Sequence, residues 1–136
     1  MPKYWILKTD SDTYPFGHLE RDGRTVWDGV ANALALQHIR GMAKGDQVMI
    51  YHSGGDKAIV GLARVTSAPY ADPKKKDPKL AVVDIEAAGR LPRPVPLATL
   101  KADPVFADLG LVRQPRLSVM PVPASQWKRL LALAGA

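Results

Sequence analysis

Short runs of apolar and β-branched residues recur along the chain, and polar residues, glycines and prolines separate them. Runs of this length between turn residues are typical of β-strands. Gly61 interrupts one run, which indicates either a β-bulge or a close approach by another backbone or a ligand. The pattern predicts strands at residues 3–8, 25–27, 47–52, 58–65, 80–85 and 117–122, a hairpin turn at 53–56, and an extended, proline-rich segment at 91–96.

Other segments carry apolar residues at helical spacing. Pro15 suits the start of one helix, and the Asn32 side chain can accept a hydrogen bond from a free amide in the first turn of another. Residues 68–79 are rich in proline and lysine and predict an irregular, mobile loop. The pattern predicts helices at 16–21, 33–42 and 124–133, short helical turns at 97–101 and 104–109, and a polar turn at 113–116.

Strands outnumber the longer helices, and helices interrupt them along the chain. Neither a doubly wound parallel sheet nor a plain sandwich fits this order. Closing a small sheet into a barrel protects its edges. We therefore predict an α+β fold in which a small barrel of mixed or antiparallel strands is flanked by helices, and one domain over residues 1–136.

The formal net charge is +6, which favours a polyanionic partner because each phosphate contact releases condensed counterions. The sequence has no cysteine, and its histidines (His18, His38 and His52) are widely spaced. We expect no metal and no cofactor. No apolar run is long enough to cross a bilayer, and residues 1–5 lack the pattern of a signal peptide, so we expect a cytoplasmic protein.

Trp27 is followed by Asp28, Gly29 and Val30, a combination that core packing does not require. Aromatic faces stack on nucleobases with about 1 to 3 kcal/mol each, and glycine permits close backbone approach. Trp5 fits the core or a pocket equally well, whereas Trp127 on the last helix is expected in the core. These residues predict an aromatic pocket around Trp27 for a flat ligand.

Alternative functions remain open at this point. An enzyme that processes RNA or a nucleobase could use Lys8, Asp10 and His52 as acid or base groups, although no spacing of residues indicates a catalytic site. A small-molecule sensor with its ligand stacked on Trp27 is a further alternative. Structural roles for the aspartates and for His52 are favoured, so we predict a non-catalytic protein.

Ordered blocks along nearly the whole chain resemble the EVE domain family. They lie at residues 4–8, 12–14, 27–30, 51–53, 58–61, 91–95 and 111–119. The resemblance implies a PUA-like fold, an open or pseudo-barrel of strands flanked by helices. It also implies a reader of a modified base in DNA or RNA, with 5-methylcytosine and 5-hydroxymethylcytosine as leading candidates.

The resemblance also implies which side chains line the pocket. Carried onto this chain, they are Trp5, Lys8, Thr9, Trp27, Asp28, Gly29, Val30, Asn32, Tyr51, His52, Ser53, Arg113, Leu117 and Ser118. An aromatic wall would stack the extruded base, and polar groups would bind its hydrogen-bonding edge.

The chain departs from the family after Val30. Relatives commonly continue with Arg-Asn-Tyr-Gln-Ala-Arg, whereas residues 31–36 here contain neither arginine nor tyrosine. The family's Ser-Glu-Pro after the first strand is replaced by Thr-Asp-Ser at residues 9–11. We therefore expect the phosphate contacts to come from elsewhere, namely from Arg113, Arg116, Lys74, Lys75 and Lys76.

Overall fold

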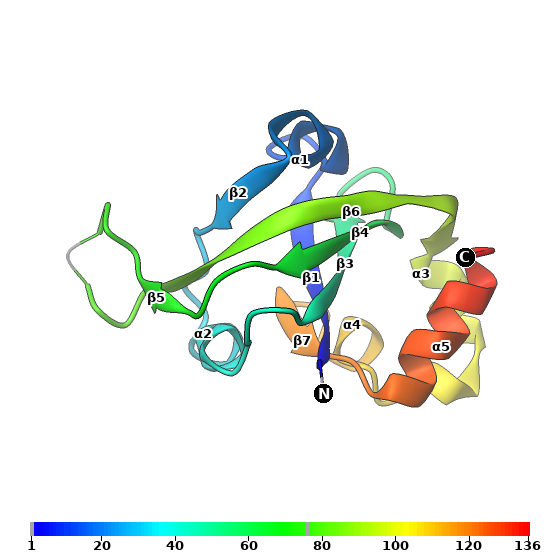
Figure 1. Cartoon of the computed structure of the whole chain (residues 1–136). Coiled ribbons are helices and arrows are strands. Elements are labelled where there is room, and N and C mark those ends of the chain that lie inside the picture. Colours follow the sequence, from blue (N-terminus) through cyan, green and yellow to red (C-terminus); the bar gives the residue numbers. More distant parts are fainter. Residues whose placement is uncertain (1, 76) are drawn as a thin grey trace.

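A mixed β-sheet curls into an open half-barrel with helices around it (Figure 1). The computed structural model describes residues 2–75 and 77–136. The strands are β1 (Tyr4–Asp10), β2 (Arg24–Trp27), β3 (Gln47–Ser53), β4 (Ala58–Val65), β5 (Tyr70–Ala71), β6 (Ala81–Pro96) and β7 (Val119–Pro121). The helices are α1 (Phe16–Asp22), α2 (Ala33–Arg40), α3 (Leu97–Ala102), η1 (Pro104–Phe106), α4 (Gly110–Arg113) and α5 (Ala124–Leu133).

The strands follow the order β2-β6-β4-β3-β1-β7, and β5 pairs with β6 beside this path. β1 and β3 run parallel, and the other described pairs are antiparallel. The predicted α+β class and the open barrel flanked by helices are therefore confirmed. β1 lies between β3 and β7, which explains why Trp5, Ile6 and Leu7 are all buried.

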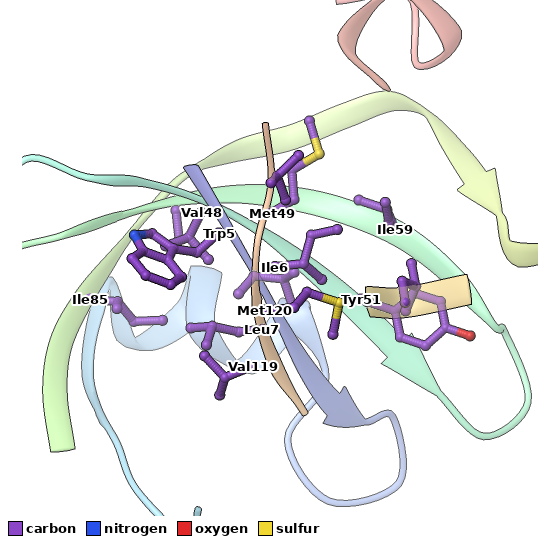
Figure 2. Close-up of a cluster of buried hydrophobic side chains, with 14 of the residues drawn as sticks. Trp5, Ile6, Leu7, Val48, Met49, Tyr51, Ile59, Ile85, Val119 and Met120 are labelled. Carbon is purple, nitrogen blue, oxygen red and sulfur yellow. The ribbon is translucent and has the colours of Figure 1, made fainter. Parts of the chain in front are cut away.

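Trp5 belongs to the core, which settles the choice left open by the sequence. Its side chain is 4% exposed, and its indole N–H donates to an Asp46 carboxylate oxygen at 2.9 Å. Figure 2 shows Trp5 among the buried side chains of β1, with Leu7 nearby. Tyr4 points the other way and stacks on Trp127, with ring centroids 4.7 Å apart, so the core placement of Trp127 is also confirmed.

Gly61 in β4 lies at a β-bulge, one of the two alternatives that its position predicted, and the atoms that approach it closely belong to a side chain. The pairing of β4 with β6 shifts register between Ile59 and Gly61, as at a β-bulge. The Phe16 ring also lies so close that a Cβ at Gly61 would overlap it. The Arg90 guanidinium covers the same ring, 5.4 Å from its centroid. Because Gly61 has no side chain, the Phe16 ring can pack directly against β4, and this contact holds the start of α1 against the sheet.

Several predicted boundaries were wrong. β6 is continuous from Ala81 to Pro96, although the sequence indicated two separate segments. Its prolines are tolerated because β2 pairs only with residues 83–86 of β6, which leaves the proline-containing end at an open edge. The predicted loop 68–79 instead contains β5, and the polar turn predicted at 113–116 follows a short helix, α4, that the pattern did not indicate.

The connection from β5 to β6 is organised by two aspartates. The side chains of Asp72 and Asp77 accept hydrogen bonds, each 2.9 Å long, from the backbone N–H groups of Lys74 and Lys79. The Arg40 guanidinium donates to the Lys79 carbonyl at 2.6 Å and ties this connection to α2. The segment therefore forms a hydrogen-bonded hairpin that extends away from the sheet (Figure 1).

Candidate functional site

A cavity of about 650 Å³ opens where β1 and β2 end. We call it the Trp27 cavity. It is lined by Lys8, Thr9, Asp10, Thr13, Tyr14, Thr25, Val26, Trp27, Asp28, Gly29, Val30, Lys74 and Ser118. Its walls come from the ends of β1 and β2, the connections that follow them, the β5–β6 hairpin and the segment before β7.

Trp27 and Tyr14 form the aromatic side of the Trp27 cavity. Trp27 is the last residue of β2, where pairing with Val83 of β6 fixes its position. It is 8% exposed, and its ring meets the Tyr14 ring edge to face at a centroid distance of 6.3 Å. Gly29 has a φ of 78°, a value that few other residues adopt, so the chain turns directly after Asp28. The sheet therefore fixes the position of Trp27, and Tyr14 packs against it from the β1–α1 connection.

Lys8 supplies a half-buried cation to the same cavity. Its ammonium group donates to the Pro115 carbonyl at 2.6 Å and lies 5.7 Å from the centroid of the Tyr51 ring. Burial lowers the pKa of Lys8 from its ordinary value, because the charged form loses part of its hydration. Lys74 adds a second cation, while Asp10 and Asp28 supply carboxylates. The lining can thus bind both donors and acceptors of a flat polar ligand.

A second concavity, of about 400 Å³, is lined by Asn32, Leu34, Gln114, Pro115, Arg116 and Leu117. We call it the Pro115 hollow. The Asn32 side-chain oxygen accepts a hydrogen bond from the Ala35 N–H at 3.0 Å, so this residue caps α2 as predicted. Asn32 and Leu117, which the resemblance assigned to the base pocket, lie here together with Arg116.

The structure brings together seven residues of the predicted base pocket: Lys8, Thr9, Trp27, Asp28, Gly29, Val30 and Ser118. Lys74, predicted as a phosphate contact, lies in the same lining. The remaining predicted residues lie in neither lining: Trp5, Tyr51, His52, Ser53, Arg113 and Lys75. Lys76 was also predicted as a phosphate contact and lies outside the described residues.

Burial of side chains on β3 explains why part of the prediction misses the cavity. Tyr51 and His52 are in register with Lys8 and Thr9, but they are only 3% and 5% exposed. Ser53 follows them and donates to the Thr9 carbonyl at 3.3 Å. These side chains support β1 from the neighbouring strand, whereas Lys8 and Thr9 reach the lining.

His52 has a structural role. Its Nε2 accepts a hydrogen bond from the Phe16 N–H, and its Nδ1 lies 2.8 Å from an Asp56 oxygen. The first bond requires the proton on Nδ1, which then donates to Asp56. Both ring nitrogens therefore have partners within the protein, and His52 offers no free nitrogen for the acid or base role considered above.

The resemblance left out part of the cavity lining. Tyr14 and Thr13 lie in the block 12–14 that supported the resemblance, yet they were not carried into the pocket. Thr25 and Val26 directly precede Trp27, and Asp10 appeared only as a possible acid or base. Adjacency to Trp27 could have identified Thr25 and Val26. Tyr14 could not be identified without knowing how the β1–α1 connection folds back over β2.

Residues 2–75 and 77–136 offer neither a metal site nor a membrane-spanning helix. In this part of the chain, no three histidine, aspartate or glutamate side chains gather as ligands for a metal ion. Also within these residues, no helix has the length and apolar character needed to cross a membrane.

Comparison with known proteins adds to this geometry. The model of the EVE domain matches residues 3–133. Thymocyte nuclear protein 1 of Danio rerio is 30% identical over 130 residues, which cover 79% of this chain and 56% of that protein. The match therefore extends over little more than half the length of this relative.

Solved structures share the fold. A protein from Rhodopseudomonas palustris, solved by NMR, is 37% identical with a TM-score of 0.92, and the alignment covers 98% of this chain and 93% of the other. The human THYN1 protein in complex with DNA containing 5-methylcytosine is 24% identical with a TM-score of 0.87, and the alignment covers 98% of both chains. At this identity the second likeness establishes the fold only. With the family model matched from residue 3 to residue 133, the chain belongs to the EVE domain family.

Proposed function

We propose that this protein is a non-catalytic DNA-binding module that accepts a modified cytosine, extruded from its strand, in the Trp27 cavity. The observation that carries this proposal is an open cavity of about 650 Å³ with an aromatic side and cations in its lining. The human THYN1 protein, which has the same fold, was solved with DNA containing 5-methylcytosine. The net charge of +6 supports a polyanionic partner.

The lining matches the groups of an extruded cytosine. Trp27 and Tyr14 offer the aromatic surface that an unstacked base needs. Asp28 can accept from the exocyclic amine, whereas the Lys8 ammonium and the Ser118 hydroxyl can donate to the ring carbonyl. Val26 and Val30 supply apolar contacts for a 5-methyl group.

Binding titrations with matched oligonucleotides test the proposal. Single-stranded and duplex DNA and the equivalent RNA would carry cytosine, 5-methylcytosine or 5-hydroxymethylcytosine at one position, at two salt concentrations. We expect tighter binding of DNA with a modified base, and a loss of about tenfold or more in Trp27→Ala, because a base–aromatic contact contributes about 1 to 3 kcal/mol.

Two further variants keep the test interpretable if Trp27→Ala does not fold. Trp27→Phe keeps an aromatic ring and should retain most of the affinity. Asp28→Ala removes an exposed cavity carboxylate and should weaken binding of cytosine and 5-methylcytosine alike, because both carry the exocyclic amine, whereas Asp108→Ala removes an exposed carboxylate outside both linings and should not. Equal affinity for modified and unmodified oligonucleotides, or an affinity that neither Trp27→Ala nor Asp28→Ala reduces, would refute the proposal.

A further inference from the structure

The Pro115 hollow shares a wall with the Trp27 cavity. Leu117 lines the hollow and the next residue, Ser118, lines the cavity. Val30 lines the cavity and Asn32 lines the hollow, and two residues of extended chain span at most about 7 Å. The Lys8 ammonium in the cavity is bonded to the Pro115 carbonyl of the hollow. The two concavities are therefore neighbours across a thin partition.

The lining of the hollow combines apolar surface with side-chain amides. Leu34 is 38% exposed on α2 and is one of the few large apolar side chains that the described part of the chain leaves at the surface. Pro115 and Leu117 complete the apolar part. Gln114 and Asn32 contribute amide groups that can donate to and accept from a base edge. Apolar surface edged by amides, with the Arg116 guanidinium beside it, can contact the face of a nucleobase and bind its edge.

Cations lie where a nucleotide chain would place its phosphates. Lys8 stands at the partition, and its hydrogen bond to Pro115 is exposed to solvent. Arg116 lines the hollow, and Arg113 precedes it at the end of α4. Within the described residues, neither arginine has a carboxylate within 4.0 Å. A strand that crosses from cavity to hollow would place its connecting phosphate next to Lys8, with arginine beyond it.

We propose that the Pro115 hollow binds the base adjacent to the modified cytosine on the same strand, so that the protein recognises a dinucleotide step. This inference rests on the proposed function of the Trp27 cavity. Because the hollow lies on one side of the cavity, only one neighbour of the modified base, either the 5′ or the 3′ neighbour, enters it. The opposite neighbour contacts neither concavity.

Trinucleotides with an abasic position test this inference. The ligands are single-stranded DNA trinucleotides with central 5-methylcytosine and a base or an abasic sugar on either side, so that all carry the same phosphates. In the wild-type protein, loss of the base on one side should weaken binding about tenfold, because its apolar contacts and its hydrogen bonds to the amides are lost, and loss on the other side less than about twofold. The same series with central cytosine measures the preference for 5-methylcytosine independently of the effect of the neighbouring base.

Variants of the hollow complete the experiment. Leu34→Ala and Gln114→Ala change exposed side chains and should remove the dependence on the neighbouring base while keeping the preference for 5-methylcytosine. Val105→Ala, at a residue that is 50% exposed on η1 and outside both linings, is the matched control and should behave as wild type.

The possible outcomes separate the two proposals. A preference for 5-methylcytosine without any effect of either neighbour would overturn the dinucleotide inference and leave the proposed function intact. A one-sided effect of the neighbour without a preference for 5-methylcytosine would keep the hollow as a base site and overturn the modified-base function. Symmetrical loss from both sides, or no binding of any trinucleotide, would overturn the inference.

Discussion

At the scale of single residues, Asp46 is a buried carboxylate that serves the core. It is 2% exposed and accepts three hydrogen bonds, from the Trp5 indole, the Lys3 backbone N–H and the Ala43 backbone N–H, at 2.9 to 3.0 Å. Hydrogen bonds to a charged group are stronger than those between neutral groups. Asp46 therefore fixes the start of β1 to the segment before β3.

Asp46→Ala should lower the free energy of unfolding by about 3 kcal/mol, because it leaves three donors without their acceptor in a buried site. Asp46→Asn keeps one carbonyl oxygen and should lose less. Denaturant unfolding of both variants measures this. Asp108→Ala, an exposed carboxylate, should change stability by less than about 0.5 kcal/mol. A loss in Asp46→Ala no greater than that in the control would contradict this role.

Residue types alone could indicate Trp27, Asp28 and Gly29 as an unusual group, and the structure places all three in one lining. They could not separate Trp5 from Trp27, since both follow strand-forming residues. Trp5 lies in the core because its indole N–H donates to Asp46, a residue that is distant in sequence. Likewise, His52 looked like a possible base because its two partners, Phe16 and Asp56, come from other segments.

At the scale of elements, the β5–β6 hairpin shows what sequence patterns miss. β5 has two residues, Tyr70 and Ala71, too few to produce a hydrophobic period. Its position is fixed by pairing with β6 and by the Tyr70 hydroxyl, which donates to an Asp84 carboxylate oxygen at 2.6 Å. α4 was missed for the same reason, because four residues carry too little pattern. Apart from β6, the longer helices and strands were predicted to within a few residues.

The Tyr70 hydrogen bond leads to a pH-dependent prediction. The bond to Asp84 raises the pKa of Tyr70 to about 12 from an ordinary value of 10.0. Its stabilisation is therefore complete below pH 10 and disappears as the pH rises through about 12. Since Tyr70 is 37% exposed, Tyr70→Phe should lose only about 0.5 kcal/mol at neutral pH.

Denaturant unfolding of wild type and Tyr70→Phe on both sides of this pH window measures the effect. The stability difference should shrink as the hydroxyl of the wild-type protein ionises. Asp84→Asn should remove most of the pH dependence that distinguishes the two proteins. A difference that stays constant from neutral pH to the upper end of the window would show that the hydrogen bond has no part in it.

At the scale of the whole molecule, the sequence predicts the barrel but not the two concavities. The curled sheet and its flanking helices could be predicted because strand and helix periods extend over many residues. The two concavities could not, because their walls come from connections that meet only after folding: 28–32, the β5–β6 hairpin and 114–118. The net charge of +6 does not indicate which of these segments meets a polyanion.

Salt dependence can locate that contact. If Lys74 binds a phosphate beside the Trp27 cavity, Lys74→Ala should reduce the slope of log affinity against log salt by about 0.9 for duplex DNA, and should weaken modified and unmodified sites alike. Lys101→Ala removes the same charge from α3, at the opposite side of the molecule from β5 (Figure 1). That control should leave the slope unchanged, and equal slopes for the two variants would contradict the assignment.

The turn at residues 28–32 has a consequence for protein engineering. It lies between two fixed points, since Trp27 is held by β6 and the Asn32 side chain caps α2. The intervening residues are exposed or half-buried, and Asp28, Gly29 and Val30 line the Trp27 cavity. Exchanging residues 28–31 would therefore change the lining of the Trp27 cavity while the scaffold on either side keeps its shape.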